Sequence, residues 1–336
     1  MADRRLFIKS IAALTAGLGI PGGLAATEKK SGRDRLGNIL PQRKLGRTNE
    51  FVTMLGVGGY HIGWTTERDA QEVVEAALEG GVRFFDTAES YDAGRSEERY
   101  GKYLTPKYRD LVFLTSKSTG KNAKTVQEHL EGTLRRLKTD HLDLYQVHAV
   151  ETPADVDGRI REGVLEVMMK AKQEGKARYI GFTGHQNPNA HARMLEQTKA
   201  NDIFDVVLMP VNVLDQSYFS FIQNVMPAAL ERNMAITSIK SLADGRFFRE
   251  KKEAGWRSDD PVVPNYMSIR EAMYFVWSLP VSVLISGNEN ATFMREKIEL
   301  ARNFSELTQE QRTALAEKVK AIAMTGSVEY FKKEEA

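Results

Sequence analysis

The sequence contains no cysteine among its 336 residues. Disulfide bonds, thiol catalysis, iron–sulfur clusters and zinc–thiolate sites are therefore excluded, and we predict no metal site. A charge surplus is also missing, because 47 basic residues face 45 acidic ones. Proteins that bind nucleic acid usually carry a basic patch or stripe, so this balance argues against that class. The apolar runs are too short to predict a stable membrane span.

The small positive surplus comes from the start of the chain. Arg4 and Arg5 precede a mildly apolar run from Ile11 to Ile20, which leads into a stretch of small residues. This order is typical of a secretory signal, and the paired arginines resemble a twin-arginine export signal. We expect residues 1–26 to be a signal peptide cleaved near Ala26, and the protein to be exported, for example to the periplasm, by the twin-arginine machinery. An amphipathic helix on a cytoplasmic protein is the alternative.

The residues after this segment predict a lead-in and a hairpin. Residues 27–38 are polar and contain glycine, so we expect them to be flexible. Residues 39–45 and 50–55 flank Gly46–Asn49, which is a hairpin signal.

The rest of the chain alternates between predicted strands and predicted helices. We predict strands over residues 55–62, from Phe84, and over residues 111–115, 142–147, 179–182, 204–213, 234–239 and 281–285. A strand followed by a helix, eight times, is the pattern of a (β/α)₈ TIM barrel. We place this α/β barrel at residues 39–325, with a C-terminal helix over 308–323 and a tail over 326–336. The alternative is an open doubly wound sheet, but Gly56-Val57-Gly58-Gly59 lacks the last glycine of its phosphate loop.

Three consecutive predicted strands end in ionisable residues. Asp86 and Tyr91 follow the second strand, Lys117 ends the third and His148 ends the fourth. Carboxyl ends of barrel strands converge on one mouth, so we expect one site. The Lys117 ammonium would lower the pKa of Tyr91 from its ordinary value near ~10, and Asp86 would keep Lys117 charged. Tyr91 could then protonate a developing alkoxide while His148 donates to a bound carbonyl.

Each of these residues also has a structural explanation. Asp86 and Lys117 could form a structural ion pair, Tyr91 could pack in a loop, and His148 could be a core histidine. A barrel hydrolase that uses Asp86 and Glu89 as acid and base is a further alternative. Glycosidases, however, place such carboxylates on opposing strand ends rather than three residues apart in one loop.

The order and spacing of these four residues resemble the tetrad of the aldo-keto reductases. The resemblance runs from about Leu40 to Arg302. It implies NAD(P)H-dependent reduction of a small aldehyde or ketone by hydride transfer, with NADPH as cofactor and NADH as the alternative. It also implies that Tyr91 is the general acid, Lys117 and Asp86 its tuners, and His148 the residue that orients the carbonyl. A nicotinamide-binding sensor of the same fold, with little turnover, is the alternative.

The same resemblance implies a set of cofactor contacts: Gly59, Tyr60, Thr183, Asn212, Lys240, Ser241, Leu242 and Gly287. The sequence departs from the family pattern nearby, since Leu208 replaces a frequent glutamine and Ile239 replaces a stacking tyrosine. These replacements motivate the sensor alternative.

The turn after Gly287 leaves the choice between NADPH and NADH open. Asn288-Glu289-Asn290 carries no cation for a 2′-phosphate, which proteins usually bind with arginine or lysine. Arg295 and Lys297 could serve instead, whereas Glu289 would favour an unphosphorylated ribose.

Overall fold

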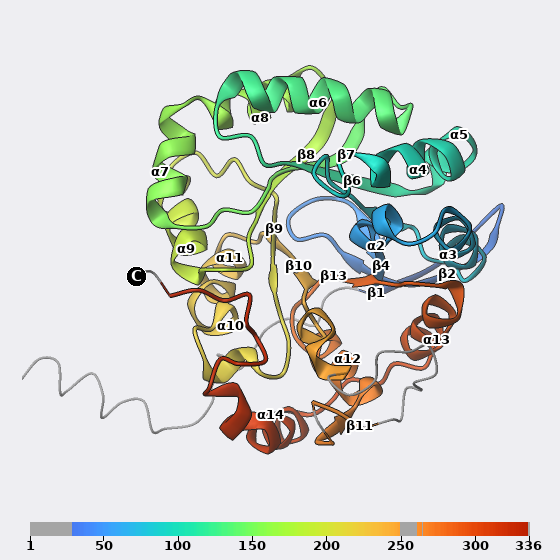
Figure 1. The fold of residues 1–336 in the computed structure, drawn as a ribbon, viewed down its shortest axis with the longest axis vertical. Coiled ribbons are helices and arrows are strands. Elements are labelled where there is room, and N and C mark those ends of the chain that lie inside the picture. Colours follow the sequence, from blue (N-terminus) through green and yellow to red (C-terminus); the bar gives the residue numbers. More distant parts are fainter. Residues whose placement is uncertain (1–28, 249–260, 264, 335–336) are drawn as a thin grey trace, which may run out of the picture.

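The computed structural model describes residues 29–248, 261–263 and 265–334. Eight parallel strands close into a barrel at the centre of Figure 1, and helices surround it. Hydrogen bonds link the strands in the order β10-β13-β4-β5-β6-β7-β8-β9. The predicted (β/α)₈ fold is therefore confirmed, and the open sheet is excluded.

The barrel strands are β4 (Leu55–Gly58), β5 (Phe84–Asp86), β6 (Phe113–Ser118), β7 (Leu142–Val147), β8 (Ala177–Thr183), β9 (Val206–Pro210), β10 (Ala235–Ile239) and β13 (Val283–Gly287). The helices are α2 (Gly59–Trp64), α3 (Glu67–Glu79), α4 (Arg95–Tyr103), α5 (Thr105–Tyr108), α6 (Ala123–Leu137), α7 (Pro153–Arg161), α8 (Val164–Gln173), α9 (Pro188–Gln197), α10 (Phe221–Asn224), α11 (Met226–Glu231), α12 (Ile269–Trp277), α13 (Ala291–Arg302) and α14 (Gln309–Ala323). Short 3₁₀ helices cover Arg109–Leu111, Asp215–Ser217 and Ala243–Phe248, and β11 (Pro261–Val262) pairs with β12 (Met267–Ser268).

A small antiparallel sheet of β1 (Lys29–Asp34), β2 (Gly37–Lys44) and β3 (Phe51–Thr53) precedes the barrel. The pairing of β2 with β3 confirms the predicted hairpin. In the described part of the predicted flexible lead-in, residues 29–38, strand β1 pairs with β2 instead. Backbone hydrogen bonds do not depend on side-chain polarity, and Asp34 finds a partner in Arg83 at 2.7 Å.

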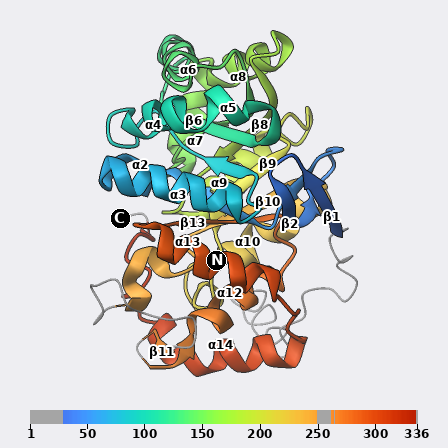
Figure 2. The same ribbon diagram turned by 90° about the vertical axis from the view of Figure 1, so that its right-hand side faces the viewer.

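The small sheet covers the amino-terminal end of the barrel, on the right in Figure 2. Leu45 and Val52 are 0% and 2% exposed and join the apolar cluster inside the barrel. A ring stack of Phe84 on Phe113, with centroids 5.3 Å apart, belongs to the same cluster. A larger core fills the space between the strands and the surrounding helices.

Helix boundaries follow the caps that the sequence carries. Thr308 and Gln311 form the predicted capping box of α14. The helix predicted over residues 222–231 divides into α10 and α11, because Pro227 has no N–H for a continuous helix. Helix α7 was not predicted.

The first predicted strand, over residues 55–62, is shorter than expected. Strand β4 ends at Gly58, and α2 begins at Gly59, where a Cβ would lie 2.2 Å from the carbonyl oxygen of Asp86. This close approach of two strand ends turns the chain away from the barrel.

The remaining predictions concern the signal peptide at the start of the chain, the tail at its end, and membrane spans. The predicted signal and its cleavage near Ala26 lie outside the described residues. Of the predicted tail over 326–336, the structure describes residues 326–334, and Glu329, Phe331 and Lys332 among them are buried. Within the described ranges, the helices fall short of the length and apolar character that a membrane span requires.

Candidate active site

Lys117 is the centre of the site. Its side chain projects from β6, is 1% exposed, and lies beside β5 because the two strands are neighbours in the barrel. The ammonium donates to Asp86 Oδ2 and to the carbonyl oxygen of Thr87, each at 2.7 Å, and to Tyr91 Oη at 3.3 Å. The structure thus brings three of the four predicted residues into direct contact.

The ion pair between Asp86 and Lys117 is almost fully enclosed. Thr115 on β6 donates to Asp86 Oδ1 at 2.7 Å, so both carboxylate oxygens have partners. Burial acts to lower the pKa of Lys117. The Asp86 carboxylate and Tyr91 raise this pKa by more than burial lowers it, so the net change is upward. Lys117 is therefore held in its charged form at the bottom of the mouth, as the sequence predicted.

Tyr91 lies in the turn after β5. Its ring meets the rings of Tyr60 and His148 edge to face, with centroids 5.6 Å apart in each pair. Burial raises the pKa of Tyr91, and Lys117 lowers it by a smaller amount, so the pKa lies above its ordinary value. The predicted net lowering is wrong, because desolvation of the phenolate outweighs the nearby ammonium.

His148 follows β7 on the next strand of the barrel. Burial lowers the pKa of His148 well below its ordinary value, and the positive charge of Lys117 lowers it further. The imidazole is therefore neutral near pH 7, and Ser90 Oγ lies 3.4 Å from its Nδ1. If Ser90 donates to Nδ1, the ring proton stays on Nε2, which can then donate to a ligand.

Two residues that the sequence did not single out support this arrangement. Arg159, on the unpredicted helix α7, donates to the carbonyl oxygens of His148 at 2.9 Å and Ala149 at 3.0 Å. Asp155, one turn earlier, holds the Arg159 Nε at 3.0 Å. This i, i+4 charge pair was the available signal in the sequence.

Glu89, the acid of the hydrolase alternative, is engaged elsewhere. Its Oε1 accepts hydrogen bonds from the backbone N–H of Thr119 at 2.8 Å and from the Thr119 hydroxyl at 2.5 Å. His129 Nδ1 lies 3.2 Å from the same oxygen. Glu89 therefore ties the loop that carries Tyr91 to the end of β6.

Two predicted cofactor residues, one at the end of β8 and one just after β9, differ in what they can offer a ligand. Thr183 accepts from the backbone N–H of Ala149 at 3.1 Å, which leaves its hydroxyl proton to donate. Asn212 is saturated, because Nδ2 donates to the Lys240 carbonyl and to Glu329 while Oδ1 accepts from Leu214 and Asp215. Asn212 thus fixes the chain after β9 instead of presenting a free amide.

The predicted residues after β10 lie at the edge of the mouth. Lys240 has a left-handed backbone with φ of 56°, and its ammonium lies 2.9 Å from Asp244 Oδ1. Ser241 and Ser238 share a hydrogen bond of 3.1 Å, and Leu242 packs against the core. Lys240, with a side chain 20% exposed, is the member of this group that can reach an anion.

The predicted residues on the β4 and β13 side lie close together. Gly287 pairs with Gly58, next to Gly59, and the exposed Tyr60 ring follows on α2. A Cβ on Gly287 would lie 2.1 Å from His61 Nδ1, a buried atom with no hydrogen-bond partner among the described residues. His61 Nδ1 therefore packs directly against Gly287, which leaves no room for a side chain at this position.

Lys297 lies behind the turn that follows Gly287. Its ammonium donates to the Gly287 carbonyl and to Asn288 Oδ1, each at 2.9 Å, and its side chain is 3% exposed. Burial lowers the pKa of Lys297 to about 8. Lys297 therefore supports the turn from within, whereas Arg295 is exposed on the same helix.

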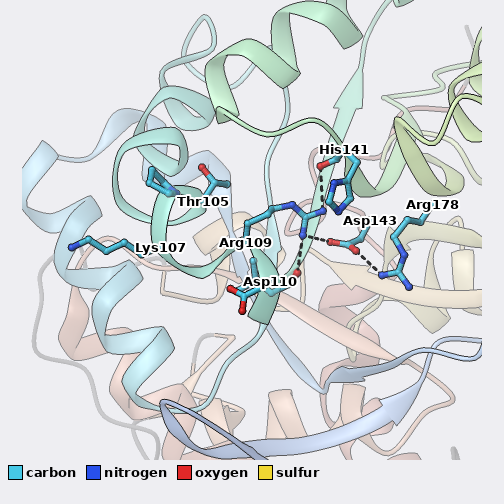
Figure 3. Close-up of a pocket in the computed structure, with 9 residues that line it drawn as sticks. Thr105, Lys107, Arg109, Asp110, His141, Asp143 and Arg178 are labelled. Carbon is cyan, nitrogen blue, oxygen red and sulfur yellow. Dashed lines mark hydrogen bonds and ion pairs between the residues drawn. The ribbon is translucent and has the colours of Figure 1, made fainter.

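A hollow of about 510 Å³ lies where β6, β7 and β8 begin, at the end of the barrel opposite Tyr91 (Figure 3). Its charges pair with one another, since Asp143 bonds Arg109 at 2.9 Å and Arg178 at 2.7 Å. We assign this network to the stability of the barrel end.

Comparisons with known proteins agree with this architecture. A model of the Aldo/keto reductase family matches residues 54–321. The uncharacterized oxidoreductase YqkF of Bacillus subtilis (strain 168) is 24% identical over 306 residues, which cover 82% of this chain and 95% of that protein. The holo form of an aldo-keto reductase from Bacillus halodurans has a TM-score of 0.68 at 22% identity, covering 82% of this chain and 95% of that one.

A second solved structure gives the same picture. An aldo-keto reductase from Klebsiella pneumoniae, in complex with NADPH, has a TM-score of 0.61 at 21% identity and covers 80% of this chain and 92% of that one. The family match extends over most of the chain and the whole barrel. The chain therefore belongs to the aldo/keto reductase family, a family of oxidoreductases.

Proposed function

We propose that this protein reduces an aldehyde or ketone to an alcohol with NADPH as cofactor, and that Tyr91 is the general acid. The observation that carries the proposal is the position of the Lys117 ammonium, which bonds both Asp86 and Tyr91 inside the barrel mouth. A buried lysine that contacts a phenol is suited to stabilising the phenolate left behind by proton donation. The family assignment supports this chemistry.

A nicotinamide bound in the mouth would supply a hydride to the carbonyl carbon. Tyr91 gives its phenolic proton to the carbonyl oxygen, which completes the alcohol. Lys117 stabilises the resulting phenolate, while Asp86 keeps Lys117 charged and fixed. His148, neutral and with Ser90 near Nδ1, donates its Nε2 proton to the same oxygen as a hydrogen bond and orients the substrate.

The chain offers a partial but consistent set of groups for the dinucleotide. Thr183 would donate its hydroxyl proton to the carboxamide, and Lys240 would meet the phosphates. Gly59, Tyr60 and Gly287 would line the adjacent part of the site. We propose NADPH as the first candidate because of the family assignment and the NADPH-bound structural relative. NADH is the second candidate, since Lys297 is turned inward and Glu289 lies at the turn.

The proposal is tested with the Tyr91→Phe variant. Loss of the phenolic proton is expected to lower carbonyl reduction by at least about 100-fold, with NADPH binding retained. Oxidation of NADPH, followed by absorbance across a panel of aldehydes, measures turnover, and quenching of protein fluorescence measures binding. Unchanged turnover in this variant would refute the assigned role of Tyr91.

A nicotinamide-binding sensor is the second candidate. The saturated Asn212 and the aliphatic Ile239 favour it, because neither provides a strong contact to a nicotinamide ring. NADPH binding without turnover on any member of the panel would select this function over reduction.

We also propose that the protein is exported through the twin-arginine machinery, on the strength of Arg4-Arg5 and the apolar run behind them. Replacement of both arginines by lysine is expected to leave the full-length chain in the cytoplasm. The intact mass of the protein from each cell fraction decides the question, since cleavage near Ala26 removes the signal.

A further inference from the structure

The segment that follows α14 packs across the mouth of the barrel. Residues 327–334, here called the C-terminal strap, leave α14 in red and run past α10 in Figure 1. Glu329 and Lys332 are 2% and 5% exposed, so the strap is built into the fold.

A buried ion cluster holds the strap in place. Lys332 Nζ donates to Asp215 Oδ1 and Glu329 Oε2, each at 2.7 Å, and to the Tyr218 carbonyl at 2.8 Å. The side chains of Lys332 and Asp215 are both fully buried. Buried charges are tolerated only with such close partners, and removing one partner strongly destabilises the rest. Lys332 is therefore the residue that contributes most to holding the strap against the barrel.

Two series of contacts lead from the strap to Lys240. Glu329 Oε1 accepts from Asn212 Nδ2 at 2.7 Å, and the same amide donates to the Lys240 carbonyl at 3.3 Å. Tyr330 Oη donates to Asp244 Oδ2 at 2.6 Å, and Asp244 Oδ1 lies 2.9 Å from the Lys240 ammonium. One series fixes the backbone of Lys240 and the other fixes its charge.

The strap also contacts the next strand end around the mouth. The backbone N–H of Lys333 donates to the Gln186 carbonyl at 2.9 Å, and the rings of Phe331 and His185 lie 6.1 Å apart. The strap therefore spans the chain segments that follow β8, β9 and β10.

We propose that Glu329, Tyr330 and Lys332 are positioning residues, which hold Lys240 ready for the phosphates of a nicotinamide dinucleotide. The inference rests on the proposed function, because it takes the dinucleotide as the ligand. A lysine side chain loses much freedom on binding, so a prior restraint strengthens binding. If only a fraction of the molecules have the strap attached, the apparent affinity for the dinucleotide falls in proportion to that fraction.

The test compares Lys332→Met with Lys333→Met, which changes the exposed neighbouring side chain. In Lys332→Met, hydrogen–deuterium exchange of residues 327–334 should become fast without ligand, and the Kd for NADPH should rise by about tenfold or more. Lys333→Met should match the wild type in both measurements. The exposed Tyr330→Phe variant, which leaves the buried cluster intact, should raise the Kd for NADPH with exchange of the strap unchanged.

The outcomes separate this inference from the proposed function. If wild type binds NADPH and Lys332→Met binds it equally well while its strap exchanges fast, the positioning role is overturned and the proposed function stands. If Lys332→Met does not fold, an unchanged Kd in Tyr330→Phe overturns the role. If wild type binds neither NADPH nor NADH, the proposed function fails and the inference fails with it.

Discussion

Arg159 donates a hydrogen bond of 2.9 Å to the backbone carbonyl of His148, and a second of 3.0 Å to that of Ala149. The guanidinium is 2% exposed, and Ala149 has a left-handed backbone with φ of 55°. A non-glycine residue in this conformation is held by its surroundings. Arg159 therefore fixes the direction in which the imidazole of His148 leaves β7.

The first prediction concerns the hydrogen bonds of Arg159 to the backbone carbonyls of His148 and Ala149. Arg159→Lys keeps the charge but loses the fork that reaches two carbonyls, so His148 should lose its fixed orientation. We expect kcat for carbonyl reduction to fall by about tenfold and the Kd for NADPH to stay unchanged. The control is Arg161→Lys on the same helix, where the side chain is 73% exposed. Equal kinetics in both variants would contradict the role of Arg159.

The second prediction separates stability from chemistry at the ion pair. Lys117→Met leaves Asp86 buried without its cation and should lower the free energy of unfolding by about 3–5 kcal/mol. The double variant Asp86→Asn with Lys117→Met removes the orphaned charge and should regain much of that loss, yet it should not regain turnover.

Urea denaturation and NADPH oxidation measure the two effects. Lys170→Met, which breaks an exposed pair with Glu174, serves as control and should change stability by less than about 0.5 kcal/mol. A double variant with restored activity would show that Lys117 has no chemical role.

The third prediction is a loss of stability in acid. Burial lowers the pKa of His191 to about 4 from an ordinary 6.5. The unfolded chain therefore binds protons that the folded chain refuses, and the free energy of unfolding falls as pH drops from about 6.5 to about 4. His191 alone should account for about 3 kcal/mol over this window. Urea denaturation at a series of pH values should show a flatter dependence in His191→Gln than in the surface control His141→Gln.

The fourth prediction concerns the pH dependence of reduction. The pKa of Tyr91 lies above its ordinary value and that of His148 well below, so both groups keep their required protons near neutrality. We expect kcat/KM for reduction to be level between about pH 6 and about pH 9. A basic limb near neutral pH would show that Tyr91 titrates lower than its burial implies.

The fifth prediction compares two glycines. A Cβ at Gly59 would lie 2.2 Å from the Asp86 carbonyl oxygen, so Gly59→Ala should displace the end of β5 and lower both stability and turnover. Gly158 lies within α7, where an added Cβ would meet the end of the Arg161 side chain at an ordinary 3.9 Å, and Gly158→Ala should stabilise the protein by about 0.5–1 kcal/mol. Thermal unfolding of the two variants gives the comparison.

The sequence was sufficient for the barrel and for the proximity of Asp86, Lys117 and Tyr91. Apolar periodicity identifies strands, and strand order then brings neighbouring ends together. It was insufficient for the net pKa of Tyr91, because the extent of burial depends on the rings of Tyr60 and His148, which come from other elements.

Long-range polar contacts were also beyond reach. The amide of Asn212 is of a type that often contacts ligands, but it bonds Glu329, which is 117 residues away in the sequence. Strand β1 is polar throughout, and only its partner β2 gives it a structure. In each case the deciding interaction joins residues that no local pattern connects.

The sheet of β1, β2 and β3 has a kinetic consequence. Leu45 and Val52 fill the amino-terminal end of the barrel and close it. A ligand can therefore reach Tyr91 only from the opposite, carboxyl-terminal end. The proposed nicotinamide dinucleotide and carbonyl substrate would both have to enter through this one end. If the proposed nicotinamide lies deeper than the carbonyl substrate, it must bind first and leave last, and we expect an ordered rather than a random kinetic scheme.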